Sequence, residues 1–218
     1  MAAIDPITLE MLATWAPANQ TLFTIYSEII NGSLVFPTLE GHIFRVRRAD
    51  TANGTFFRQV LDIELSSILP TGHSPMSTMY DSDGNVWFAA TSIPSMGSTD
   101  NSSMIGFVDP DGAIHTKTIE DQRIDNAMAL NGRTVYINSG PLGDSDHANA
   151  TGHVFAFQAD GSDGVRTVWK ESYSAGSMIK PGGFARGSGS SPSLVGDKFV
   201  AITDNADGQV NLVVYRQV

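Results

Sequence analysis

Short apolar runs alternate with polar turns along the whole chain. The clearest unit begins near residue 74 and holds four strand-length runs, the last of which alternates apolar and polar residues like a half-exposed strand. Asp83-Gly84 and the segment Asp109 to Gly112 suit tight turns, because Asp and Gly tolerate a positive φ. The predicted strands of this unit are residues 75–80, 85–90, 104–108 and 113–119.

The same order of strands and turns returns in three more units. The period of about 50 residues, with four strands per unit, is typical of a β-propeller. We therefore predict an all-β fold, a β-propeller of about four four-stranded blades in a single domain. The other predicted strands are 22–29, 33–36, 41–47 and 56–63, then 124–130, 134–138, 152–157 and 165–170, then 191–195, 198–203 and 210–216. The predicted blades are residues 1–16 (partial), 17–66, 67–120, 121–172 and 173–218, the last without its outer strand.

The two ends of the chain leave two arrangements open. Residues 7–12 follow Asp5-Pro6 as the outer strand at 113–119 follows Asp109-Pro110, so they are expected to be an outer strand. This strand would either complete the last blade and close a four-bladed ring, or belong to a partial propeller from a six- or seven-bladed protein. The second arrangement is favoured, because the start shows no basic and apolar leader and lies inside a turn.

Composition narrows the classes of partner. The chain has 218 residues, of which 41% are hydrophobic, and a formal charge of −10, so nucleic acid is not an expected partner. No apolar run is long enough to span a membrane, and no cysteine is present. The short Arg45–Arg48 run is expected to be an edge strand with alternating solvated arginines. A monomer is expected if the chain is complete.

Five Asn-X-Ser/Thr sequons favour a secreted glycoprotein. Polar loop residues with no glycan are the alternative. The five asparagines are Asn19, Asn31, Asn53, Asn101 and Asn149.

Polar loops that enter the inner strands would line the central channel of a propeller. Asp125 and Asn126 offer oxygen ligands suited to calcium, and His73 is a candidate general base because its pKa is ordinarily near neutrality. The competing interpretations are a turn cap for Asn126 and a loop hydrogen bond for His73.

A glycine-rich segment at 180–191 supplies two further candidates. Arg186 would meet an anionic ligand and Ser191 would line the channel, unless the segment is a flexible linker between blades. It lacks the Gly-Lys-Ser/Thr ending of a phosphate-binding loop. Asp144, Asp146 and His147 could chelate a metal, although a solvated loop is the favoured interpretation, as it is for residues 204–208.

The sequences at 81–89 and 125–136 resemble six-bladed propellers of the senescence-marker/gluconolactonase type. Streptogramin lyases, NHL-repeat proteins and secreted fungal propellers look similar. The resemblance implies a channel calcium that supports hydrolysis of a lactone or ester, with Asn126 as one ligand. The family's later aspartate has no counterpart at 191–193, and its N-terminal glutamate is not identifiable.

Three functions remain open at this stage. The first is a calcium-dependent lactonase- or esterase-like hydrolase of a small molecule, in which the metal polarises a carbonyl and His73 moves a proton. The second is a non-enzymatic propeller that binds a small molecule, glycan or protein. The third is a truncated fragment with exposed strand edges and no activity of its own.

Overall fold

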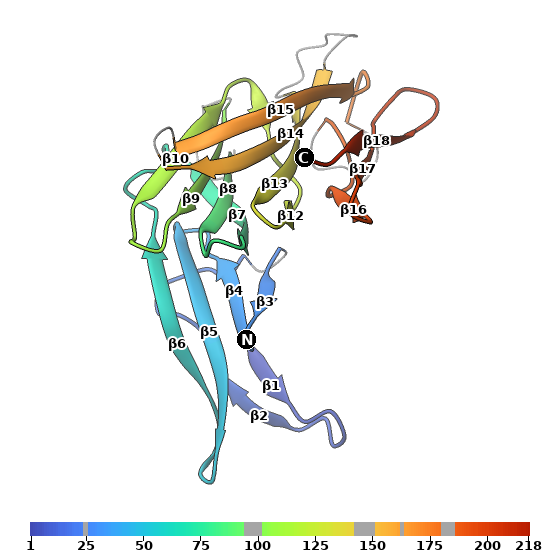
Figure 1. Ribbon diagram of the computed structural model, residues 1–218. Helices are drawn as coiled ribbons and strands as arrows, with labels where there is room; N and C mark the ends of the chain where they lie inside the picture. The colour runs from blue at the N-terminus through green and yellow to red at the C-terminus, as the bar shows by residue number, and fades with distance from the viewer. Residues whose placement is uncertain (24–25, 94–101, 142–150, 162–163, 180–185) are drawn as a thin grey trace.

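The computed structural model describes residues 1–23, 26–93, 102–141, 151–161, 164–179 and 186–218. These residues form strands, turns and irregular segments, so the predicted all-β fold is confirmed. Within the described ranges, no helix is long and apolar enough to cross a membrane. The strands form antiparallel sheets that follow one another along the chain (Figure 1).

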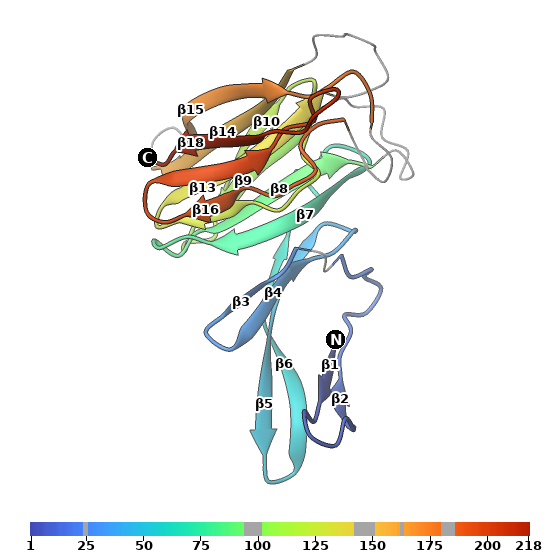
Figure 2. The same ribbon diagram turned by 90° about the vertical axis from the view of Figure 1, so that its right-hand side faces the viewer.

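The first large sheet is built on a long hairpin. Its order is β3-β4-β5-β6, and β5 and β6 run well beyond the neighbouring sheets (Figures 1 and 2). Because β5 pairs with a strand on each side, the prediction of an edge strand at Arg45–Arg48 was wrong. The strands are β3 (Glu28–Ile30), β4 (Ser33–Pro37), β5 (His42–Thr51) and β6 (Gly54–Glu64).

A β-bulge divides this hairpin into two parts. Arg45 pairs with Leu61 and Val46 pairs with Gln59, which leaves Val60 as an extra residue on β6. A bulge bends its strand and increases the local twist. Apolar side chains of β6 therefore serve two cores: Phe57 packs against the cluster Phe36, Phe44 and Val46, whereas Ile63 packs against the cluster that includes Val35 and Ile43.

The N-terminal residues form a separate hairpin of β1 (Ala2–Ile4) and β2 (Met11–Thr14). The predicted outer strand at 7–12 is thus a turn and an irregular segment as far as residue 10, and its strand begins only at Met11. This strand pairs with β1 and not with the last sheet, so residues 1–14 do not close a ring here. Trp15 holds the hairpin in place by packing edge-on against Phe36 and Phe44, with ring centroids 6.0 and 5.9 Å apart.

Three further sheets complete the chain, and most of their strands match the predicted ones closely. The strand predicted at 124–130 is shorter than expected, as is the strand predicted at 22–29 in the first large sheet. The second sheet has β7 (His73–Tyr80), β8 (Val86–Ser92), β9 (Ser103–Val108) and β10 (Ile114–Ile119). The third has β11 (Gln122–Arg123), β12 (Ala129–Asn131), β13 (Thr134–Pro141), β14 (Thr151–Asp160) and β15 (Gly164–Ser174). The fourth has β16 (Ser193–Val195), β17 (Phe199–Thr203) and β18 (Leu212–Arg216).

The segments that lead into successive sheets lie side by side. Tyr26 forms a parallel bridge with Ser77, and Ser77 Oγ in turn accepts a hydrogen bond of 3.3 Å from the backbone N–H of Met128. The backbone N–H of Ala127 donates to Ser191 Oγ at 3.2 Å. These contacts bring the polar loops of the predicted site into one region.

Candidate functional site

The predicted residues Asn126 and Ser191 come together through a loop that precedes β16. Asn126 Nδ2 donates a 2.8 Å hydrogen bond to the carbonyl of Ser188, and Ser191 Oγ accepts the bond from Ala127. Both contacts join the third sheet to the fourth. Asn126 and Ser191 therefore hold the chain together at this point, and their bonding groups face protein.

The same loop is anchored at two further points. Asn138 Nδ2 donates to the carbonyl of Ser190 at 2.9 Å, and the hydroxyl of Ser190 accepts the backbone N–H of Thr203 at 2.9 Å. Tyr173 lies beneath the loop, where its hydroxyl donates to the carbonyl of Ser139 and accepts the N–H of Ser188. Burial raises the pKa of Tyr173, so it stays a neutral donor.

Asp125 forms an ion pair with its neighbour Arg123. The distance from Arg123 Nε to Asp125 Oδ1 is 2.5 Å, and both side chains are mostly buried. Burial raises the pKa of the Asp125 carboxyl, and the Arg123 charge and hydrogen bond act in the opposite direction. The arginine thus occupies one oxygen of the carboxylate that calcium binding would need.

His73 and Arg186 are both buried, at 5% and 4% exposure. Nε2 of His73 lies 3.0 Å from the carbonyl oxygen of Ser102, so a solvent-borne substrate would reach this ring only if its neighbours moved. Arg186 Nε donates a 2.8 Å hydrogen bond to the carbonyl of Gly176. This bond fixes the start of the loop, and the guanidinium points into the protein.

Calcium takes six to eight oxygen ligands. Within the ranges that the structure describes, no three His, Cys, Asp or Glu side chains gather into one cluster. The calcium site therefore stays a prediction. Residues Asp144, Asp146 and His147 lie outside the described residues.

The acidic segment at 204–208 forms a turn. Asp204 Oδ1 accepts the backbone N–H of Asn211 at 2.7 Å, and its other oxygen accepts the Asn211 side-chain amide at 2.8 Å. Asp207 Oδ1 accepts the backbone N–H of Ser177. These bonds agree with the interpretation that the sequence favours for residues 204–208, namely a loop between two strands and not a metal site.

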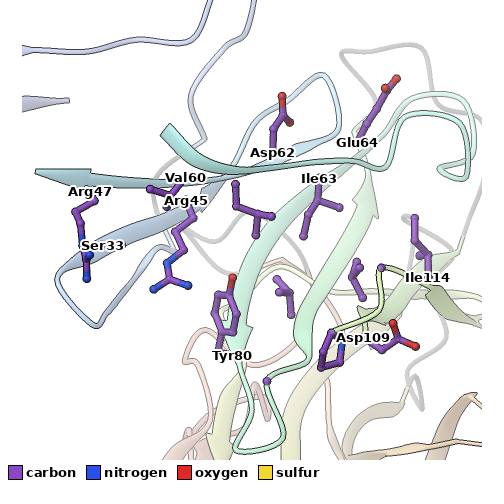
Figure 3. Close-up of a pocket in the computed structure, with 16 residues that line it drawn as sticks. Ser33, Arg45, Arg47, Val60, Asp62, Ile63, Glu64, Tyr80, Asp109 and Ile114 are labelled. Carbon is purple, nitrogen blue, oxygen red and sulfur yellow. The ribbon is translucent and has the colours of Figure 1, made fainter. Parts of the chain in front are cut away.

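A cleft of about 690 Å³ opens between the first sheet and the second (Figure 3). One wall is the face of β4, β5 and β6 that lies toward β7–β10, and the other wall is made by the ends and turns of β7 to β10. Sequence reasoning did not predict this site. Its lining includes Ser33, Arg45, Arg47, Val60, Leu61, Ile63, Tyr80, Val86, Val108, Pro110 and Ile114.

Two polar groups of the cleft are buried and have no hydrogen-bond partner among the described residues, namely Ser33 Oγ and Arg45 Nε. The guanidinium carbon of Arg45 lies 5.6 Å from the ring centroid of Tyr80, a cation–π distance that holds this side chain in place. Arg47 lines the same cleft and donates to the carbonyl of Asn31 at 2.8 Å. Both atoms are covered by protein, so a ligand in the cleft would meet the outer part of the Arg45 guanidinium and the Arg47 side chain.

The acidic residues near the cleft are directed elsewhere. Asp62 and Glu64 point away from it in Figure 3, and Asp62 Oδ1 lies 2.7 Å from Nδ1 of His42. Asp109 Oδ1 accepts the backbone N–H groups of Asp111 and Ala113, and these bonds lower its pKa. The lining therefore holds three carboxylates as well as two arginines, and the arginines lie together at the end of the cleft near β4 and β5.

The sequence does contain a signal for this cleft, in the spacing of its arginines. Arg45 and Arg47 are two residues apart on one strand, so both point to the same face. The adjacent Arg48 points to the other face and pairs with Asp50 in solvent. What the sequence does not show is that this face of β5 meets a second sheet.

Comparison with known proteins assigns no family, since no family model matches the chain and no curated protein sequence matches it significantly. The resemblance to gluconolactonase-type propellers therefore stays a prediction.

Proposed function

We propose that this chain is a ligand-binding protein without catalytic activity, and that the cleft between its first two large sheets is the binding site. The observation that carries the proposal is the cleft itself, whose lining places Arg45 and Arg47 at one end and aliphatic side chains along the rest. The groups expected to act in hydrolysis are instead engaged in internal bonds, as with Asn126 to Ser188 and Asp125 to Arg123.

We further propose that the sheets are successive blades of a β-propeller. Two observations support this arrangement. Each large sheet is a meander of neighbouring strands, and the segments that lead into successive sheets contact one another through Tyr26, Ser77, Met128 and Ser191. The predicted blade limits near residues 66, 120 and 172 fall at or close to the boundaries between sheets.

The proposal is tested against the calcium-dependent hydrolase by two measurements on the unmodified chain. We expect its melting temperature to be the same in excess calcium and in chelator, because Asp125 is paired with Arg123 and the Asn126 amide is bonded to Ser188. A ligand at 100 times its Kd would otherwise add about 2.7 kcal/mol of stability. We also expect no turnover of lactones or aryl esters above the buffer rate.

Calcium-dependent turnover would contradict the proposal. Asn126→Ala alone is a poor test, because it also removes the bond to Ser188 and so lowers stability whether or not a metal binds. Asn126→Asp is the better variant, since a second carboxylate beside Asp125 would strengthen a real calcium site.

We also propose that the chain is secreted and glycosylated. Of the five sequons, three lie in the described residues, and their asparagines Asn19, Asn31 and Asn53 are all exposed. The chain expressed through a eukaryotic secretory pathway is expected to lose mass on treatment with an amidase that removes N-glycans. If the amidase leaves the mass unchanged, and if Asn53→Gln does not lower the mass of the secreted chain either, these asparagines are ordinary polar turn residues.

A further inference from the structure

We propose that the ligand of the cleft is a small organic carboxylate with an apolar body. This inference rests on the proposed binding function and adds the chemical class of the ligand. The carboxylate would meet Arg45 and Arg47, and the apolar part would lie along the aliphatic wall that includes Ile63 and Ile114.

The end of the cleft near β4 and β5 is suited to the head group. Ser33 is opposite Arg47 on the paired strands, and Val35 is opposite Arg45, so Ser33 and both arginines share one face. A guanidinium presents a planar set of donors that matches a carboxylate. Stacking on Tyr80 orients the Arg45 guanidinium before any ligand arrives.

The rest of the cleft is suited to an apolar body. Its lining from β6, β8, β9 and β10 is mainly aliphatic, and Figure 3 shows Val60, Ile63 and Ile114 directed into the space. A volume of about 690 Å³ falls in the range that holds a small organic molecule. An inorganic anion such as phosphate would leave this wall unfilled.

The test is calorimetric titration with 4-phenylbutyrate and three comparison compounds. Acetate carries the head group without the body, 4-phenylbutyramide carries the body without the charge, and inorganic phosphate is an anion without a body. We expect 4-phenylbutyrate to bind more tightly than each of the others by about tenfold or more, because only it uses both ends of the cleft.

Variants then locate the site. Arg45→Gln is expected to weaken 4-phenylbutyrate binding by about tenfold or more, and Arg47→Gln by a few-fold. Arg48→Gln is the matched control, since it removes the same charge from the opposite face of β5 and should leave the affinity unchanged. Thermal melts check that each variant is folded.

Each other outcome is decisive. Equal binding of the amide or of phosphate would overturn the carboxylate class while leaving a binding function in place. Binding that survives Arg45→Gln would overturn the site. If none of the four compounds binds, this inference is overturned. The proposed function fails by a different result, namely calcium-dependent turnover of a lactone or ester.

Discussion

Replacement of Asp81 by alanine is expected to lower the free energy of unfolding by about 3 kcal/mol, because this single buried carboxylate organises a whole turn. Its Oδ1 accepts the backbone N–H groups of Asp83 and Asn85, both at 2.9 Å. Its Oδ2 accepts the Asn85 side-chain amide at 2.7 Å and the indole N–H of Trp87 at 2.8 Å. Since Trp87 is fully buried, the indole would be left without a partner and without access to water.

Thermal unfolding provides the measurement, with a drop of roughly 6–12 °C expected for a chain of this size. Asp109→Ala is the matched control, because Asp109 begins the same kind of Asp-X-Asp-Gly turn and accepts the corresponding backbone bonds. Its turn is exposed to water, so its loss should shift the melting temperature much less. Equal shifts for the two variants would show that burial of the Asp81 network is not what stabilises the second sheet.

Replacement of Gly140 by alanine is expected to destabilise the chain by about 3 kcal/mol or more, because the new methyl group has no space. A Cβ at this position would lie 1.9 Å from the carbonyl oxygen of Arg186. That oxygen belongs to the backbone, and the loop that follows it is fixed by the bonds of Ser188 and Ser190. The loop cannot move aside without breaking the connection between the third and fourth sheets.

Gly189→Ala is the control for this prediction. Gly189 lies in the same loop, but a Cβ there meets nothing within 4 Å. Chemical denaturation of both variants should therefore show a large loss of stability for Gly140→Ala and almost none for Gly189→Ala. If Gly140→Ala keeps its stability, the close approach of β13 and the Arg186 backbone is not a feature of the protein in solution.

Most of the strands could be predicted from the sequence, because alternation and Asp-Gly or Asn-Gly turns are local signals. The turn at Asp83-Gly84 and the strands on either side of it are one example. The segment at 7–12 was predicted less well. It alternates like a strand, but Asp5 Oδ1 accepts the N–H groups of Ile7 and Thr8 and so forms a turn there.

The site was harder to predict, because it depends on which sheet faces which. The loops at 122–126 and 187–192 were expected to converge, and the structure places Asn126 against Ser188 and Ala127 against Ser191. Their use as internal bonding partners depends on the path of residues 186–191, which glycine-rich sequence does not specify. Arg45 was assigned to solvent because nothing local to β5 shows that Tyr80, far along the chain, stacks against it.

The extra residue on β6 has a consequence for how this molecule can change over evolutionary time. The pairs Arg45–Leu61 and Val46–Gln59 would both survive loss of Val60, so deleting one codon would leave the ladder intact and only reduce its twist. Val60 also lines the cleft, so the same deletion would remove part of its aliphatic wall. The shape of the pocket is thus tied to one extra residue, and a descendant could alter it while keeping both arginines.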